Sequence, residues 1–474
     1  MGRRAGLQAG RRPGTARGAD SERVRGGSSR ASPFFFALYA LRESVLFGPM
    51  LDLARYPLDR LASRVGTPFY LYDGDELRSS VTRFAEIVGR PGLAGRYAMK
   101  ANSCRKILDV VLEAGLWIDA VSGNEVLRAR RAGFPGGSEP PVILLTTDVF
   151  RDNALETVLE HRVMPNVGSP GMIGELRAGG YRGPIAVRVN PGFGQGHVES
   201  CDTGGPSSKH GVWPDRLADV RRLAAEARLP ITTLHVHVGT GPELREFDTN
   251  VGRLVEFLKG LLPDFPDTES VNLGGGIPHP YHPDGSSYDL ASLRALLDEA
   301  GGIFSDTAGR AIRVEVEPGR CLVAGGAVLV ARVRDVKETR ANARGQGHTF
   351  VMVDAGFCDL LRPALYGSYH HIQVWGPGAE APDEPCIVAG PLCESGDIFT
   401  RGDRELVRPR LMPRPGPGAL LVLQDAGAYG SAMSSNYLSI GRAAEVWWET
   451  GRGTLIARRE TVEDIVSVEC DVPL

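Results

Sequence analysis

The chain has 474 residues, enough for two domains and for a core that needs no disulfide bonds. Lysine and arginine total 54 against 57 aspartate and glutamate, and this net charge of -3 gives no electrostatic reason to expect a nucleic acid or an anionic membrane as a partner. No apolar stretch approaches the roughly 20 residues of a membrane span. The cysteines are scattered and form no C-x-x-C pair, which argues against a zinc ribbon and favours a reducing cytoplasm. They are Cys104, Cys201, Cys321, Cys358, Cys386, Cys393 and Cys470.

The first part of the chain differs in composition from the rest. Residues 1–32 are rich in Arg, Gly, Ser and Ala and show no hydrophobic period. The apolar stretch that follows, Phe34 to Leu41, is short and lies far from the arginines, so it is a poor secretory signal. An organelle transit peptide is one alternative. A disordered tail, or a start codon placed too far upstream, accounts better for the composition, and we expect a disordered leader over residues 1–50.

The extended run of residues 68–72 comes next, and short β-like runs then alternate with amphipathic stretches from about residue 95 to residue 320. We predict eight strands in this region, over residues 96–100, 117–121, 142–146, 163–167, 185–190, 232–238, 271–273 and 313–317. One stretch between them places apolar residues on a single helical face: Val251, Leu254, Val255, Leu258 and Leu262. Eight strands with helical crossovers predict an α/β fold of the (β/α)8 barrel type. A doubly wound open sheet is the alternative, since periodicity alone cannot close a barrel.

Polar residues near the carboxyl ends of the predicted strands favour the barrel over the open sheet. In barrel enzymes this rim carries the chemistry. The residues are Lys100, Ser122, Asp148, Asn190, His237, the glycines at 274–276 and Glu317.

After about residue 320 the sequence changes to β-rich runs separated by Gly, Pro and charged turns, with little helical period. The runs cover residues 327–336, 349–354, 385–388 and 419–424. We expect a second, mostly antiparallel β domain, into whose sheet residues 68–72 could pair. The predicted domains are the barrel over residues 74–318 and a β domain made of residues 51–73 and 319–474.

Lys100 ends a short apolar run and is followed by the small and polar residues Ala101 and Asn102. A lysine at the mouth of a strand can hold a cofactor aldehyde as a Schiff base. Read by itself, this run fits a surface lysine at a strand end better. Motifs further along the chain supply the other parts that such a site needs.

Two motifs could hold a phosphorylated pyridine. Gly274, Gly275 and Gly276 follow an apolar run, so their backbone N–H groups could approach a phosphate without interference from a Cβ atom, although a flexible turn is the alternative. Glu317 closes the eighth predicted strand, where a carboxylate can pair with a protonated pyridine nitrogen. Arg320 can meet a phosphate or a carboxylate. A surface salt bridge on a turn is the alternative for this second motif.

His235 and His237 lie two residues apart, and therefore on the same face of a strand. Such a pair can bind a metal ion, but no acidic or cysteine ligand lies nearby at a suitable spacing, and we expect no metal site. An imidazole stacked on an aromatic cofactor is the better functional interpretation for one of the two, with Thr240 near the phosphate. A hydrogen-bonded core histidine is the alternative.

The predicted β domain contains further candidate residues in Gly-rich loops. Cys393 and Glu394 could pair a proton donor with an acceptor for a substrate amine, although an ordinary loop is the plainer interpretation. Arg362 suits a bidentate grip on a carboxylate, and Tyr366 and Tyr429 lie in similar settings.

Longer runs are more specific than these short motifs. They are VNPGFG (189–194), SKHG (208–211), VDAGF (353–357), YGSYHH (366–371) and MSSNY (433–437). With the motifs above, they show that the chain resembles the fold-type III pyridoxal phosphate decarboxylases, and within them the diaminopimelate decarboxylases, from about Gly66 to the C-terminus.

The resemblance implies an alanine-racemase-like barrel plus a β domain, in an obligate homodimer that binds pyridoxal 5'-phosphate. It implies that Lys100 carries the cofactor, that His237 stacks on the pyridine ring and that Glu317 pairs with the ring nitrogen. The remaining residues implied to bind the cofactor, several of them at its phosphate, are Thr240, Gly275, Gly276, Gly319, Arg320 and Tyr429.

By the same resemblance, the amino-acid substrate would be held by Arg320, Arg362, Tyr366, Glu394 and Tyr429. Cys393 would reach across the dimer as the proton donor. Two features depart from the family: Thr240 stands where serine is common, and the leader before about residue 50 has no counterpart.

The reaction implied is decarboxylation of meso-2,6-diaminopimelate to L-lysine, with Cys393 or Lys100 returning a proton to the carbanion. D-lysine and D-ornithine are alternative substrates, but an ornithine-type substrate would leave Arg362 without a carboxylate. A racemase is a further alternative, which the loop at 393–394 and Arg362 fit less well. Retention of Lys100, Glu317 and that loop also argues against a non-catalytic paralogue.

Overall fold

The computed structural model describes residues 50–194, 196, 202–240, 244–343, 345–402 and 405–472. The predicted leader, apart from its last residue, lies outside the described residues, as does Cys201. None of the helices in these ranges has the length and apolar character needed to cross a membrane.

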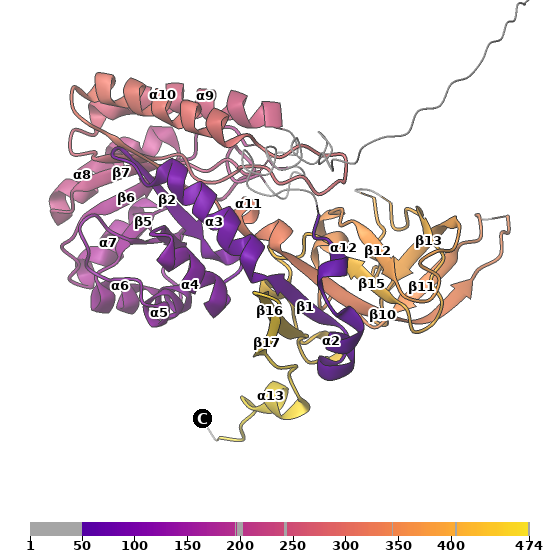
Figure 1. Cartoon of the computed structure of the whole chain (residues 1–474). Coiled ribbons are helices and arrows are strands. Elements are labelled where there is room, and N and C mark those ends of the chain that lie inside the picture. The colour runs from indigo at the N-terminus through magenta and orange to yellow at the C-terminus, as the bar shows by residue number, and fades with distance from the viewer. Residues whose placement is uncertain are drawn as a thin grey trace, which may run out of the picture. The chain divides into compact units, whose positions relative to one another are not determined.

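Eight parallel strands close into a barrel (Figure 1). They are β2 (Leu93–Ala98), β3 (Trp117–Ala120), β4 (Ile143–Thr147), β5 (Met164–Val167), β6 (Ile185–Arg188), β7 (Ile231–His235), β8 (Ser270–Asn272) and β9 (Arg313–Val316). The predicted (β/α)8 barrel is confirmed, and each predicted strand overlaps an observed one. The open sheet is excluded because β9 pairs with β2, with Leu93 opposite Val314 and Gly95 opposite Val316.

The helices that accompany these strands surround the barrel (Figure 1). They are α3 (Gly74–Val88), α4 (Arg105–Glu113), α5 (Gly123–Ala132), α6 (Ala154–His161), α7 (Pro170–Ala178), α8 (Leu217–Ala227), α9 (Leu244–Leu261), α10 (Leu290–Ala308) and α11 (Arg320–Val323). Helices α3, α5 and α10 begin at side-chain caps, because Asp73, Ser122 and Asp289 accept from backbone N–H groups of the first turn. The predicted apolar face at 251–262 is buried, with Leu258 0% exposed, so that prediction is confirmed.

A nine-stranded sheet forms the β domain. Its strands are β1 (Phe69–Asp73), β10 (Ala327–Glu338), β11 (Thr349–Val353), β12 (Ile372–Trp375), β13 (Asp383–Ala389), β14 (Arg410–Pro413), β15 (Leu420–Leu423), β16 (Ala444–Glu449) and β17 (Arg452–Ala457). Among the described strand pairs of this sheet, only β1–β16 and β11–β13 are parallel, which confirms a mostly antiparallel sheet. Strand β1 lies between β10 and β16, so the expected pairing of residues 68–72 is also confirmed.

Short helices complete the described chain. They are η1 (Leu53–Arg55), α2 (Leu58–Val65), η2 (Met99–Ala101), η4 (Pro214–Arg216), η5 (Leu262–Asp264), η6 (Ala324–Gly326), α12 (Arg362–Tyr366), η7 (Ser431–Met433), η8 (Tyr437–Ser439) and α13 (Val462–Val466). One of them corrects a predicted boundary, because Lys100 lies in η2 and not at the end of a strand. The chain leaves the sheet after Ala98, whose N–H donates to the carbonyl of Pro318 over 2.9 Å.

An ion pair in the barrel interior joins the two strands that close it. Arg96 of β2 and Glu315 of β9 are 0% and 1% exposed, and Arg96 Nε lies 2.7 Å from Glu315 Oε2. The guanidinium carbon of Arg96 also lies 4.7 Å from the ring centre of Trp117 on the neighbouring β3. Buried charges are tolerated only when they are paired, so this contact favours one arrangement of β9 against β2.

Candidate functional site

A small cavity lies at the carboxyl ends of the barrel strands. It is lined by Ala98, Lys100, His237, Thr240, Gly275, Gly276, Ile277, Glu317, Gly319, Arg320 and Tyr429. The structure therefore brings together every residue that the sequence resemblance assigns to cofactor binding, from positions 100 to 429.

Lys100 reaches this cavity from η2 and faces a carboxylate. Its Nζ atom lies 3.4 Å from Oδ2 of Asp119, a buried residue of β3. Burial alone would lower the pKa of Lys100, but the negative charges of Asp119, Tyr429 and Glu317 together outweigh burial and the pKa is raised. Burial and the nearby charge of Glu317 in turn raise the pKa of Asp119. Sequence reasoning missed Asp119, although a charged residue inside a strand buried on both faces is itself a signal.

Glu317 is buried and held by two side chains from neighbouring strands. His235 Nε2 lies 3.1 Å from Glu317 Oε2, and Asn272 Nδ2 donates to Glu317 Oε1 over 2.8 Å. Burial favours the neutral acid, but the charge and hydrogen bond of His235 outweigh it, and the pKa of Glu317 falls well below its usual range. Glu317 therefore stays ionised at neutral pH. Of the two candidate histidines, His235 is the hydrogen-bonded core residue.

His237 lines the cavity and is kept neutral. Burial lowers its pKa well below the usual range, and the positive charges of Lys100 and Arg188 lower it further. Within the described part of the chain, its Nδ1 atom has no hydrogen-bond partner. A neutral, flat imidazole in this position suits contact with an aromatic ring. Sequence reasoning missed Arg188, a buried residue at the end of β6.

The glycines after β8 pack too closely against their neighbours to carry side chains. A Cβ atom on Gly275 would lie 2.6 Å from the carbonyl oxygen of Glu317, and one on Gly276, whose φ is +111°, would lie 2.7 Å from the carbonyl oxygen of Gly239. A Cβ atom on Gly319 would lie 3.1 Å from the Cβ atom of Ala98, which is a tight contact but a milder one. These glycines form a narrow backbone cradle, which fits the predicted phosphate nest better than a flexible turn.

Pyridoxal phosphate fits this set of groups. Lys100 offers an amine for its aldehyde, Glu317 a carboxylate for its ring nitrogen, and His237 a flat neutral ring. The glycine cradle offers backbone N–H groups for its phosphate.

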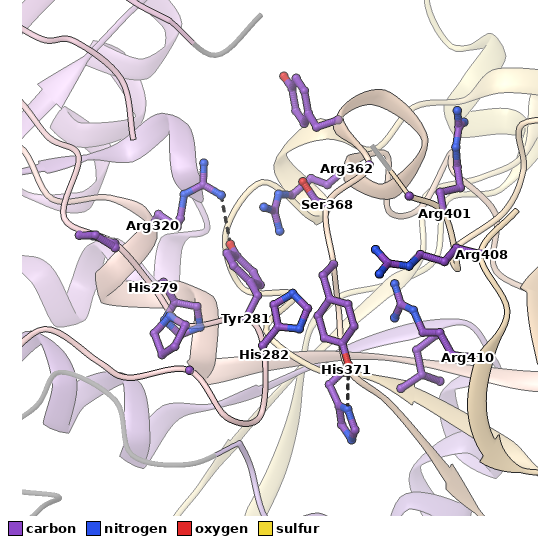
Figure 2. Close-up of a pocket in the computed structure, with 18 of the residues that line it drawn as sticks. His279, Tyr281, His282, Arg320, Arg362, Ser368, His371, Arg401, Arg408 and Arg410 are labelled. Carbon is purple, nitrogen blue, oxygen red and sulfur yellow. Dashed lines mark hydrogen bonds between the residues drawn. The ribbon is translucent and has the colours of Figure 1, made fainter. Parts of the chain in front are cut away.

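A larger cleft of about 1050 Å³ lies beside the small cavity and shares Thr240 and Arg320 with it (Figure 2). Its walls come from the loop at 278–286, after β8, and from the β domain. Three of the residues predicted to bind substrate line it, namely Arg320, Arg362 and Tyr366. The cleft thus connects the predicted cofactor residues with the predicted substrate residues.

Arg362 of α12 is 3% exposed and anchored on neutral groups. One of its N–H groups donates to His370 Nε2 over 2.8 Å, while His370 Nδ1 donates to the carbonyl of Gln424 over 2.8 Å. Its guanidinium carbon lies 4.4 Å from the ring centre of Tyr281. No carboxylate in the described ranges pairs with Arg362, so the cleft holds a buried positive charge suited to an anionic ligand.

Tyr429 belongs to a turn that packs on the lysine segment. Its φ is +56°, and its N–H donates to the carbonyl of Ala101 over 2.8 Å. Asp425, at the start of the turn, pairs with His279 over 2.9 Å in a buried contact. Sequence reasoning missed His279 and Asp425, because they are far apart in the chain and meet only in the folded protein.

The other rim residues hold loops in place. Ser122 caps α5. Asp148 Oδ2 lies 2.5 Å from Nδ1 of His210, and Asn190 Oδ1 accepts from the N–H of Gly205 over 2.8 Å. Nothing in these contacts places the three residues in the cavity. Among the described residues, no cluster of three or more His, Cys, Asp or Glu side chains could hold a metal ion.

Cys393 and Glu394 lie elsewhere, on an exposed loop of the β domain. Glu394 Oε1 accepts from the hydroxyl of Tyr437 over 2.5 Å, and Tyr437 stacks on Phe357 with ring centres 5.5 Å apart. Neither residue lines the small cavity or the larger cleft. Within one chain, the structure therefore does not bring the predicted proton donor to Lys100.

Comparison with known proteins gives a consistent result. A family model described as the pyridoxal binding domain of pyridoxal-dependent decarboxylases matches residues 75–324. Diaminopimelate decarboxylase of Escherichia coli K12 is 36% identical over 430 residues, covering 90% of this chain and 99% of its own length. The Streptomyces coelicolor enzyme of the same name is 36% identical over 431 residues, covering 90% and 93%.

Solved structures agree. A crystal structure of diaminopimelate decarboxylase superposes with a TM-score of 0.79 at 35% identity, covering 87% of this chain and 95% of its own. The Helicobacter pylori enzyme, complexed with L-lysine, superposes with a TM-score of 0.74 at 29% identity, covering 87% and 98%.

Replacing Asp119 with Asn tests the electrostatic coupling at Lys100. The substitution removes the largest of the negative charges that raise the pKa of Lys100, so the opposing effect of burial makes this pKa lower than in the wild type. More of the amine is then uncharged at a given pH. The quantity to compare is the rate at which cofactor-free protein takes up pyridoxal phosphate at residue 100, measured as a function of pH. We expect this rate to reach half its maximum at a lower pH in Asp119→Asn than in the wild type. Borohydride quenching followed by mass spectrometry measures this rate.

The matched control is Asp109→Asn, which removes a surface carboxylate paired with Arg105 at 2.6 Å. Its pH profile should match that of the wild type. A profile for Asp119→Asn that is unchanged, or shifted to higher pH, contradicts the coupling.

Proposed function

The chain belongs to the diaminopimelate decarboxylases, within the pyridoxal-dependent decarboxylases, and on that basis we propose which of its residues carry out the reaction. It decarboxylates diaminopimelate to lysine and uses pyridoxal phosphate. The observation that carries the proposed roles is the cavity joining Lys100, His237 and Glu317, with an arginine-lined cleft beside it.

Lys100 would hold the cofactor through its amine, and bound pyridoxal phosphate would supply an electron sink for the electron pair that remains when CO2 departs. Glu317 keeps a proton on the ring nitrogen, because its own carboxylate stays ionised and buried next to His235. His237 offers a neutral face to the ring. The phosphate is held by Thr240, Gly275, Gly276, Gly319 and Arg320. The support is that Gly275 and Gly276 pack too closely against backbone carbonyl oxygens to carry side chains.

Arg362, with Arg320 and Tyr366, binds the carboxylate that the substrate keeps. The support is that Arg362 is buried on neutral partners within the described chain and points into the cleft (Figure 2). A bidentate carboxylate matches the guanidinium fork. D-lysine and D-ornithine lack this second carboxylate and would leave the charge of Arg362 buried without a partner. Tyr429 lines the border between cofactor and substrate.

A homodimer supplies the remaining two groups. Cys393 returns the proton and Glu394 binds the distal amine in the site of the opposite subunit. The support is that both residues are exposed and outside the cavity of their own chain. Apolar side chains near this loop are also exposed, with Tyr437 at 40% and Leu438 at 49%. Exposed apolar surface of this kind suits a subunit interface.

The predicted domain division also forms part of this proposal. Helix α3 begins at Gly74 and β9 ends at Val316, which supports a barrel over residues 74–318 and a β domain of residues 51–73 and 319–474. The cytoplasmic location stays a prediction from the sequence.

Arg362→Lys tests the substrate grip, because lysine keeps the charge but loses the two-pronged geometry. We expect the KM for meso-diaminopimelate to rise about tenfold or more, with a smaller change in kcat. CO2 release and lysine formation measure both constants, and the cofactor absorbance should be retained. Any slow turnover of D-lysine, which lacks the second carboxylate, should not change.

Two results count against this account. An unchanged KM for diaminopimelate in Arg362→Lys would remove Arg362 from the grip. Wild-type activity on D-lysine with none on diaminopimelate would overturn the substrate itself.

Mixing two inactive variants tests the shared site. In a dimer of one Lys100→Ala subunit and one Cys393→Ala subunit, one of the two sites keeps both residues. Random reassociation should therefore restore up to about a quarter of wild-type activity. Each variant dissociated and reassociated alone is the control. Different affinity tags on the two variants allow the heterodimers to be purified. If heterodimers form but no activity returns, Cys393 does not act across the interface.

A further inference from the structure

Three arginines line the larger cleft on the side away from Arg320: Arg401, Arg408 and Arg410. They come from the β domain, with Arg410 at the start of β14. Figure 2 shows that Arg408 and Arg410 extend toward the middle of the cleft. We refer to Arg401, Arg408 and Arg410 as the outer arginines.

Two of the outer arginines donate to backbone carbonyl groups. Arg410 Nη1 donates to the carbonyl of His370 over 2.6 Å, and Arg401 Nη1 donates to the carbonyl of Ala364 over 3.1 Å. No carboxylate in the described ranges lies within 4 Å of any of their guanidinium nitrogens, whereas Arg334 and Arg414, also in the β domain, each pair with an acidic residue. The cleft therefore concentrates positive charge that protein groups in those ranges do not neutralise.

The like charges in this group interact. Burial lowers the pKa of Arg410 to about 10, the Tyr369 hydroxyl opposes the shift, and the charge of Arg408 adds to it. Burial lowers the pKa of His371 on the cleft wall, the Asp425 carboxylate opposes the shift, and the charge of Arg410 adds to it. Holding cations this close costs free energy that a bound anion would recover.

Arg410 is held rigidly in its position. Its guanidinium carbon lies 4.1 Å from the ring centre of Tyr369, and the ring of His282 stacks on Tyr369 at 3.8 Å. At such short distances from the Tyr369 ring centre, the guanidinium of Arg410 and the ring of His282 must lie on opposite faces of the tyrosine ring. The Tyr369 hydroxyl lies 3.3 Å from His371 Nδ1, which fixes the ring in turn. A guanidinium fixed before binding loses less entropy when it meets an anion.

The substrate does not account for the outer arginines. Diaminopimelate carries two carboxylates and two ammonium groups at neutral pH, so its net charge is zero. In the proposed function, Arg320 and Arg362 already meet the carboxylate that it keeps. The positive charge on the opposite wall exceeds what this ligand can neutralise.

We propose that Arg401, Arg408 and Arg410 form a second anion site, which binds a small ligand with a phosphate or pyrophosphate group in the outer half of the cleft. This inference rests on the proposed function for the inner half, where Arg320 and Arg362 hold the substrate. Because both halves belong to one cleft, an anion in the outer half obstructs the substrate. It therefore raises the apparent KM for diaminopimelate and leaves kcat unchanged at saturation.

Isothermal titration of the cofactor-loaded enzyme with inorganic pyrophosphate tests the site, since the loaded cofactor already fills the phosphate cradle. We expect wild-type protein to bind pyrophosphate and Arg408→Ala to bind it about tenfold or more weakly, as a charge-assisted contact is lost. Arg408→Glu should not bind it, because a carboxylate then pairs with Arg410. The control, Arg340→Ala, removes an exposed charge of the β domain outside the cleft and should match the wild type.

Two further titrations identify the source of the ligand group. Binding of inorganic phosphate as tightly as pyrophosphate points to the free anion. Tighter binding of a phosphate monoester, such as glycerol phosphate, points to a phosphorylated metabolite. Either result supports the site if Arg408→Glu abolishes it. In the matching kinetic assay, pyrophosphate should raise the KM of the wild type and of Arg340→Ala, but not that of Arg408→Glu.

The proposal fails if wild-type holoenzyme does not bind any of the three anions. It also fails if Arg408→Glu binds them as tightly as wild type, which would place the anion at Arg320 and Arg362. Dissociation of the Arg408→Glu protein in sedimentation would assign the outer arginines to a subunit contact instead. Decarboxylation by the wild type, measured with no added anion, separates this inference from the proposed function. If the enzyme turns over diaminopimelate normally but binds none of the three anions, only this inference is rejected.

Discussion

Strand β9 pairs with β2, and this pairing closes the barrel. Just beyond the paired residues, the N–H of Ala98 donates to the carbonyl of Pro318 over 2.9 Å, and the buried pair of Arg96 and Glu315 joins the same two strands. Lys100 follows Ala98 by two residues, and Glu317 precedes Pro318. Closure therefore brings the amine and the carboxylate to one cavity from opposite ends of the barrel sequence. In an open sheet, the first and last strands need not be neighbours.

The protonation states at the rim follow from burial and from opposite charges packed together. Glu317 stays ionised because His235 and Asn272 satisfy its oxygens, and His237 stays neutral because burial and the nearby cations exclude another charge. Asp119 favours the protonated form of Lys100, because its carboxylate raises the pKa of that amine. The chain thus prepares a charged acceptor, a neutral ring and an amine before any cofactor binds.

The sequence predicts the barrel well because strands buried on both faces are short apolar runs separated by amphipathic helices. It predicts the edges of the β sheet poorly. Strand β14 lies at one edge with Leu411 73% exposed, and β17, at the other edge, is exposed over its first four residues, so neither shows an alternating pattern. Strands β12 and β16 are also absent from the prediction. For the site, each residue that we propose to bind the cofactor follows a strand that the pattern detects. The pair of His279 and Asp425 forms only in the folded protein, and the role proposed for Cys393 depends on a second subunit.

Borohydride reduction of the cofactor-loaded enzyme, followed by peptide mapping, tests the central role of Lys100 most directly. The account predicts a pyridoxyl group on residue 100, its absence in Lys100→Ala, and its retention in Lys106→Ala, which removes the next lysine along the chain. A pyridoxyl group on another lysine, with residue 100 unmodified, would contradict the account.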